Sequence, residues 1–443
     1  MKKNLMLIPA ILILSLVFTY ITSDNGQRYM EEEALGEDRP AIERTISVSA
    51  DTVMEEDIEE TDGPENEEPP VIDVPAPQPA QSIPGLNASD ELKEKLSYMS
   101  MDFPPYEEEE EGPPKINMVV DLDYDTDVDD VVALRVAAQL HRYERVELMA
   151  VMASSAGEKP CQAMHAQLAH DGLSTVPVGY ARGGIETGSP YWKVLTDNYF
   201  NLYGYQLYDS VELYKKAIRE CMARDEKLRI VTTGYLVNIE ALLMDPQGYS
   251  LVKNGVESIW ITGGVYPKGY DHNLAHTEDA MRSANYVSLA SPVPLVYSSQ
   301  LSIQNANEDV VTAGQMVLAA DTYGTDPVTL SFRAYEKRNK TDLSCGRFAW
   351  DPFCVWAAGL TEEETMTHTV PINMTIGTNG WNEFSYDKLA NSCLLLRDHE
   401  DVSWYALQLE AWDTAGISGM SLPNYAYVMG NDIYDSSHPD EEP

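Results

Sequence analysis

Short apolar runs and longer amphipathic stretches alternate along the chain from about residue 115 onward. The short runs predict buried strands at residues 116–120, 146–152, 176–179, 228–233, 258–262 and 294–297. The longer stretches have apolar residues three and four positions apart and predict helices at residues 129–143, 159–170, 210–224, 237–244 and 278–289. This alternation predicts an α/β fold with a mostly parallel, doubly wound sheet and helices on both faces.

The last third of the chain departs from this alternation. Its pattern predicts helices at about residues 308–320, from 350 onward and at 402–411, and strands at 370–375 and 393–397. Ligands of doubly wound sheets bind beyond the carboxyl ends of the strands, so we expect the functional residues there.

The chain of 443 residues begins with Lys2 and Lys3, followed by an apolar stretch of about 17 residues at positions 5–21. We expect residues 1–23 to be an export signal or a short membrane anchor, because this length is at the lower limit for crossing a bilayer. No small-x-small triplet follows and no cysteine is nearby to accept a lipid, so both alternatives stay open. Either one predicts an extracytoplasmic protein whose N-terminal segment contacts a membrane.

Residues 24–113 are rich in glutamate, aspartate and proline, a composition that predicts a disordered acidic linker. The linker holds 27 acidic and 5 basic residues and thus −22 of the formal net charge of −42. The lack of Lys/Arg patches argues against nucleic acid as a partner, because phosphate binding depends on them. Residues 114–432 have enough apolar residues for one large domain, and residues 433–443 form an acidic tail.

Five cysteines are scattered through this domain: Cys161, Cys221, Cys345, Cys354 and Cys393. Their odd number and the absence of CxxC spacing argue against a disulfide framework. We expect them to be buried apolar residues.

Six aspartates occupy positions 121, 123, 125, 127, 129 and 130, between the first predicted strand and the first predicted helix. Carboxylates at this density repel one another unless a divalent cation neutralises them, and oxygen-only ligands favour Ca²⁺ or Mg²⁺. The other interpretation is an acidic turn that caps the helix through Asp127, with Asp130 in a capping-box position. Capping needs one or two carboxylates and leaves the other four unexplained.

Three further stretches have distinctive sequences. Residues 230–243 read IVTTGYLVNIEALL, residues 259–264 read IWITGG and precede Asp271-His272-Asn273, and Trp350-Asp351-Pro352 begins a predicted helix. Together with the aspartate run, these stretches resemble the motifs of the inosine-uridine nucleoside hydrolase family, in the same order over about residues 115–412. The run fits the long form of the family's first loop, DTDIGNDIDD, with aspartate in place of the glycine.

This resemblance implies a nucleoside hydrolase-like fold and a Ca²⁺ ion bound by the carboxylates of Asp123, Asp130 and Asp351 and the backbone carbonyl of Val237. In the family's short-loop form, Asp125 replaces Asp123 as a ligand. The end of the first apolar run favours Asp123, since it places this residue at the end of the strand.

The resemblance also implies roles toward the substrate. Asp129 would contact the substrate as the general base, accepting a proton from a cation-bound water that attacks the anomeric carbon of a ribosyl group. Asp271 and Asn273 match residues that hold the ribose hydroxyls, and a polar loop without a ligand is the other interpretation. Trp350 stands where many members have a histidine beside the leaving base, and its indole can stack on an aromatic leaving group.

Two departures from the family pattern concern the leaving group. The imidazole that could act as a general acid is missing at Trp350, and residues 153–157 lack the asparagine of better-known members. His272 and His276 lie on a nearby loop and are candidates to replace the imidazole, with exposed loop histidines as the alternative. The base preference, and whether the leaving group is a nucleobase, stays open.

We therefore expect Ca²⁺-dependent hydrolysis of the N-glycosidic bond of a ribonucleoside or related riboside, giving free base and ribose. Whether the protein is a homo-oligomer stays open. A first alternative is a surface-tethered ribose- or nucleoside-binding protein without turnover. Asp129 argues against it, because a binding protein needs no base beside the ion.

A second alternative is a haloacid-dehalogenase-like phosphatase, because Asp121 and Asp123 follow a strand as its nucleophile and acid do. The later lysine and GDxxxD motif are not found at suitable strand ends. An EF-hand calcium loop is excluded, because the sixth and twelfth positions of the run are neither glycine nor glutamate.

Overall fold

The structure, a computed structural model, describes residues 115–416 except residue 126, residues 187–190, residues 200–204 and residue 322. The expected signal or anchor at 1–23, the linker at 24–113 and the acidic tail at 433–443 lie outside the described residues. Within the described part, no helix is both long and apolar enough to cross a membrane.

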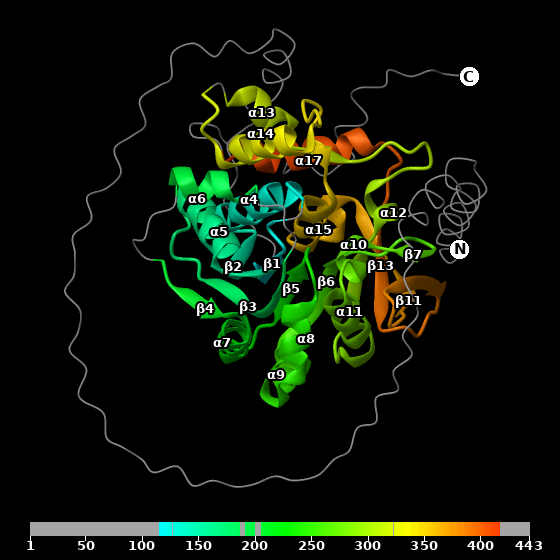
Figure 1. The fold of residues 1–443 in the computed structure, drawn as a ribbon. Helices are drawn as coiled ribbons and strands as arrows, with labels where there is room; N and C mark the ends of the chain where they lie inside the picture. The colour runs from blue at the N-terminus through cyan, green and yellow to red at the C-terminus, as the bar shows by residue number, and fades with distance from the viewer. Residues whose placement is uncertain (1–114, 126, 187–190, 200–204, 322, 417–443) are drawn as a thin grey trace, which may run out of the picture. The chain divides into compact units, whose positions relative to one another are not determined.

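An eleven-stranded sheet forms the centre of the described domain (Figure 1). Its parallel strands follow the order β4 (Leu207–Asp209), β3 (Val178–Ile185), β2 (Val146–Ser155), β1 (Ile116–Leu122), β5 (Leu228–Thr232), β6 (Val256–Thr262), β8 (Leu295–Ser298) and β13 (Ser392–Arg397). Antiparallel strands continue it: β11 (Thr367–Ile376), β12 (Trp381–Tyr386) and β7 (Lys268–Tyr270). The predicted mostly parallel sheet is confirmed.

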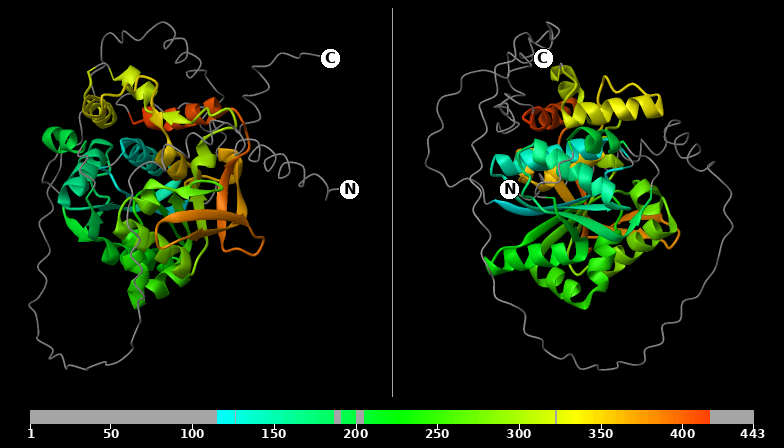
Figure 2. Two further views of the ribbon diagram at one scale, coloured as in Figure 1. Left: turned by 45° about the vertical axis from the view of Figure 1, so that its right-hand side comes forward. Right: turned by 60° about the vertical axis from the view of Figure 1, so that its left-hand side comes forward.

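Helices cover both faces of this sheet, as Figures 1 and 2 show. One face is covered by α4 (Asp129–Arg142), α5 (Glu158–His170) and α15 (Trp350–Ala358), and the other by α7 (Ser210–Ala223), α8 (Val237–Met244), α9 (Pro246–Gly255) and α11 (Glu278–Ala290). Beyond α4 lie α13 (Gln315–Ala320), α14 (Pro327–Asn339) and α17 (Val402–Thr414). The extra layer leaves α4 buried along nearly its whole length.

The predicted helix over residues 308–320 is confirmed only for residues 315–320, and its first part is wrong. This segment contains strand β9 (Thr312–Ala313), which pairs with β10 (Arg347–Phe348), and α13 begins only afterwards. Gly314 has φ +90°, and a Cβ there would lie 2.4 Å from the Phe332 ring, so a left-handed glycine separates strand from helix. The Glu410 carboxylate then accepts hydrogen bonds from the first two N–H groups of α13, at 2.7 and 3.0 Å.

Helix α14 was not predicted, although its sequence carries a start signal. Asp326 accepts a hydrogen bond from the Val328 N–H at 2.8 Å, and Pro327 occupies the first helical position. Helix α9 (Pro246–Gly255) was not predicted either. The other unpredicted helices of the described part have seven residues or fewer: α6 (Lys193–Tyr199), α10 (His272–Ala275), α12 (Gln300–Ile303) and α16 (Glu362–Thr365).

The cysteines follow the prediction in part. Cys161, Cys221 and Cys354 are buried and Cys393 is half-buried, and all are free thiols. The prediction is wrong for Cys345, which is exposed. It lies in a polar turn before β10, outside the apolar pattern on which burial depends.

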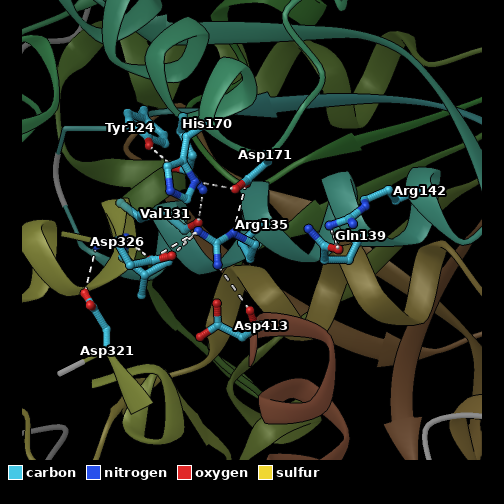
Figure 3. A network of polar contacts seen from close by, with 12 residues as sticks. Tyr124, Val131, Arg135, Gln139, Arg142, His170, Asp171, Asp321, Asp326 and Asp413 are labelled. Carbon is cyan, nitrogen blue, oxygen red and sulfur yellow. Dashed lines mark hydrogen bonds and ion pairs between the residues drawn. The ribbon is translucent and has the colours of Figure 1, made fainter. Parts of the chain in front are cut away.

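Arg135 joins α4 to three neighbouring helices through a fully buried guanidinium group (Figure 3). Its Nε donates to Asp171, at the end of α5, at 2.9 Å, and its Nη2 donates to both oxygens of Asp326, the N-cap of α14, at 2.9 and 3.1 Å. Its Nη1 donates to the backbone oxygen of Asp413 in α17 at 3.2 Å. Loss of this cation would leave buried carboxylates without their partner.

We predict that Arg135→Met lowers the free energy of unfolding by about 3–5 kcal/mol, the usual cost of removing one partner of a buried ion pair. Urea unfolding of the full chain measures this loss. Arg142→Met, at the exposed last residue of the same helix, is the matched control and should change stability by less than about 0.5 kcal/mol. Equal effects of the two substitutions would contradict the role given to Arg135.

Candidate metal and catalytic site

Three buried carboxylates from three elements converge at the carboxyl end of β1. Asp123 comes directly after β1, Asp130 is the second residue of α4, and Asp351 is the second residue of α15. One carboxylate oxygen of each lies within 4.8 Å of the other two, and each residue is at most 5% exposed. The structure thus brings together three predicted ligands, and this carboxylate group contains Asp123 rather than Asp125.

The turn after β5 lies directly against Asp123. A Cβ on Gly234 would lie 2.4 Å from the Asp123 backbone nitrogen and 2.7 Å from its Cβ, so only glycine allows this approach. Ser154, at the end of β2, joins the two segments, because its hydroxyl donates to Leu122 O at 3.2 Å and accepts from the Tyr235 N–H at 3.1 Å. Residues 153–157, which lack the asparagine of better-known nucleoside hydrolases, thus hold the end of β1 and the turn after β5 together through Ser154.

Asp121 lies in a separate environment. It is fully buried and accepts hydrogen bonds from the Tyr214 hydroxyl at 2.8 Å and from Asn238 Nδ2 at 3.0 and 3.1 Å. Burial raises the pKa of Asp121 to about 7, although these two hydrogen bonds oppose the shift. Asp121 thus links β1 to α7 and α8 through its carboxylate. The sequence alone did not indicate this link.

Asp127 is paired with Arg347, another residue that sequence reasoning missed. Arg347 Nε donates to Asp127 Oδ1 at 2.8 Å and its Nη2 bonds to Oδ2, while Oδ1 also accepts from the Val128 N–H at 2.7 Å. The guanidinium group lies 5.7 Å from the ring centre of Tyr335 and 5.4 Å from that of Phe348. Asp127 therefore orders the loop before α4 instead of joining the carboxylate group.

Asp129 lies beside the carboxylate group, where a general base is expected. Its Oδ2 accepts a hydrogen bond from the Asp351 backbone N–H at 3.1 Å, which fixes the orientation of the carboxylate. Burial raises the pKa of Asp129 well above its ordinary value, the charge of Asp127 adds to the shift, and Arg347 opposes it.

The residues present fit a hard divalent cation. Asp130 Oδ1 is buried and has no hydrogen-bond partner among the described residues. Burial raises the pKa of Asp130 and of Asp351 well above the ordinary value, and repulsion by the neighbouring carboxylates raises both further. Buried carboxylates of this kind are stable as anions when a cation neutralises them, and three oxygen donors favour Ca²⁺ or Mg²⁺ over softer metals.

The loop that holds Asp271 and Asn273 lies at the same edge of the sheet. Asn273 Nδ2 donates to Thr233 O at 2.7 Å and to Thr262 O at 3.2 Å, so it joins the ends of β5 and β6. The Asp271 carboxylate accepts from the Asn273 N–H at 3.0 Å and caps α10. Because both amide hydrogens of Asn273 bind the backbone, its side-chain oxygen is the atom left to meet a ligand.

The two remaining predicted site residues begin helices. Val237 is the first residue of α8, and its side chain packs with Tyr235, so the ligand role of its carbonyl stays a prediction. Trp350 is the first residue of α15, next to Asp351, and its half-buried indole packs against the main apolar core. Its place in a leaving-group pocket also stays a prediction.

No family model and no curated protein sequence matches this chain. Solved structures do match. The effector protein XOO4466 has a TM-score of 0.52 at 16% identity, over 74% of this chain and 99% of that chain. The type III effector XopQ, solved with adenosine diphosphate ribose, has a TM-score of 0.50 at 15% identity, over 74% and 98%.

An inosine-uridine preferring nucleoside hydrolase from Bacillus anthracis also matches, with a TM-score of 0.49 at 14% identity, over 66% of this chain and 98% of that chain. At identities this low, a structural likeness shows the fold alone. The predicted α/β fold class is thus confirmed by the sheet topology and by these neighbours.

We predict that a chelator lowers the melting temperature of the protein and that Ca²⁺ restores it. Because folding raises the pKa of the buried carboxylates, the cation-free native state binds more protons than the unfolded state. Its stability therefore falls as the pH rises above about 4, the ordinary pKa of aspartate. The increase in melting temperature caused by Ca²⁺ should accordingly be larger at pH 8 than at pH 5.

Calorimetry of the full chain with Ca²⁺ or with chelator, at both pH values, measures this difference. Asp351→Asn removes one of the charges and should abolish most of the Ca²⁺-induced shift. Identical scans with chelator and with Ca²⁺ would rule out a cation at this carboxylate group.

Proposed function

We propose that this protein is a Ca²⁺-dependent N-glycosyl hydrolase that cleaves a ribonucleoside, or a related N-riboside, into free base and ribose. The observation that carries the proposal is the buried group of Asp123, Asp130 and Asp351 with the Asp129 carboxylate beside it. A riboside ligand is also consistent with the neighbour XopQ, which was solved with adenosine diphosphate ribose.

Asp123, Asp130 and Asp351 would hold the ion, together with the carbonyl of Val237. Such an ion would supply Lewis-acid activation of the attacking water. The Asp351 N–H binds one oxygen of Asp129, and the other oxygen is then directed to accept a proton. As a water oxygen attacks the anomeric carbon, its proton would pass to Asp129, the C–N bond would break, and the base would leave with the bonding electrons.

The same residues also suit the charge that develops in this reaction. An oxocarbenium-like transition state is positively charged at the ribose ring, and nearby fixed carboxylates stabilise it. Asn273 offers its side-chain oxygen as an acceptor for a ribose hydroxyl, because the backbone of β5 and β6 binds its amide hydrogens. Asp271 supplies a second acceptor from the same loop.

A riboside-binding protein without turnover would need the same ion and ribose contacts. Asp129 separates the two proposals, since an oriented carboxylate beside the ion serves chemistry rather than binding. The phosphatase alternative loses support, because Asp121, its required nucleophile, is fully buried and bound by Tyr214 and Asn238.

Incubating the full chain with ribonucleosides and Ca²⁺, and measuring free base and reducing sugar, tests the proposal. We predict that Asp129→Asn lowers turnover by about 10²–10⁴, the usual contribution of a general base, while Ca²⁺ still raises the melting temperature. Asp351→Ala should lose both turnover and the Ca²⁺ effect. Near-normal turnover of Asp129→Asn would mean that another group is the base.

We predict that a riboside with an acidic leaving group, such as a nitrophenyl riboside, is cleaved faster than inosine or uridine, because Trp350 cannot protonate a departing base. Trp350→His should shift the preference toward the natural nucleosides by restoring a group that titrates near neutral pH. Trp350→Ala should raise KM for aromatic leaving groups, by the roughly 1–3 kcal/mol of a lost stacking contact. Indistinguishable kinetics of all three proteins would place Trp350 outside the leaving-group pocket.

A further inference from the structure

Tyr235 and His272 form a hydrogen-bonded aromatic pair. Tyr235 is fully buried, and its hydroxyl lies 3.2 Å from His272 Nε2. The ring of His276 lies 4.3 Å from that of His272 and is nearly parallel to that of Tyr235, at 6.0 Å and 22°. Both histidines are exposed, so a buried tyrosine supports two rings at the surface.

This aromatic cluster of Tyr235, His272 and His276 adjoins the site through both of its segments. Tyr235 follows Gly234, which lies directly against Asp123. His272 stands between Asp271 and Asn273, the residues proposed to hold the ribose, and Asn273 fixes this loop to the ends of β5 and β6. The cluster therefore lies at the same edge of the sheet as the carboxylates.

Hydrogen bonding defines which nitrogen of His272 can meet a ligand. Desolvation lowers the pKa of His272 to about 4, the neighbouring His276 adds to the shift, and Asp127 opposes it. A histidine ring that is neutral at pH 7 has one donor and one acceptor nitrogen. The Tyr235 hydroxyl can either donate to Nε2 or accept from it, and in the tautomer in which it donates, Nδ1 carries the hydrogen.

We propose that His272 is a specificity-determining residue whose Nδ1–H donates a hydrogen bond to an acceptor atom of the leaving base, while Tyr235 holds the ring. This inference rests on the proposed function and names its substrate class. Heteroaromatic bases with a carbonyl or ring-nitrogen acceptor would be preferred over leaving groups without one. His272 is then not the acid that protonates the departing base but a fixed donor that recognises it.

The test is kinetics and binding of the Ca²⁺-loaded full chain with inosine and with phenyl riboside, whose ring has no acceptor. His272→Phe keeps an aromatic ring but removes the donor, so it should raise KM and Kd for inosine by about tenfold, the usual effect of one lost hydrogen bond. The values for phenyl riboside should change by less than about twofold. The melting temperature and its Ca²⁺ dependence should stay unchanged.

Two further variants separate recognition from a structural role. The amide nitrogen of asparagine can take the place of Nδ1, so His272→Asn should recover most of the affinity for inosine. Tyr235→Phe removes the hydroxyl that hydrogen-bonds to the imidazole, and should weaken inosine binding without affecting phenyl riboside. His368→Phe in β11 is the matched control and should behave as wild type.

The outcomes distinguish this inference from the proposed function. If the wild type binds inosine without hydrolysing it and His272→Phe weakens that binding selectively, the proposed function fails and the recognition role stands. If the wild type hydrolyses inosine but His272→Phe affects both ligands equally, or neither, the inference is overturned and the proposed function stands. A wild type that neither binds nor cleaves inosine would overturn both.

Discussion

Mutual repulsion among buried carboxylates at the carboxyl end of β1 is the constraint on which the surrounding structure depends. Two unit charges 4.8 Å apart repel by about 3 kcal/mol at an effective dielectric constant near 20, and Asp123, Asp130 and Asp351 form three such pairs. Asp129 adds a fourth charge. A cation at this group would therefore do more than assist chemistry, because it would make the packing of α4 against α15 compatible with ionised side chains.

The other aspartates of the run show how the protein limits this repulsion. Asp121 points to different partners, Tyr214 and Asn238, which stabilise it without a cation. Asp127 is neutralised by Arg347 at the start of α4. On the opposite side of the same helix, Arg135 binds carboxylates from α5 and α14. Arginine side chains thus neutralise carboxylates at two places around helix α4, whereas Asp130 and Asp351 of the carboxylate group have no such arginine partner among the described residues.

The sequence predicted the parallel sheet well, because short apolar runs alternate with longer amphipathic stretches, a pattern typical of strands and covering helices. It also indicated Asp123, Asp130 and Asp351 through the family resemblance, and these three do converge. The partners of Asp121 and Asp127 escaped prediction because Tyr214 and Arg347 are about 90 and 220 residues away, and neither carries a local signal. The error at residues 308–320 arose because helical spacing continued across Gly314, whose left-handed conformation the pattern does not reveal.

The candidate site consists of two groups of residues: the buried carboxylates, and the aromatic side chains of Trp350 and His272. The carboxylates lie at the end of β1 and in the first turns of α4 and α15, and the buried ion pairs of Arg135 join α4 to its neighbouring helices. Trp350 and His272, by contrast, contribute no charge to the carboxylate group. Under the proposed function, substitution at these positions would change the leaving group that is accepted and leave the carboxylate group intact. This separation is the physical reason why a departure from the family's usual histidine does not by itself argue against hydrolysis.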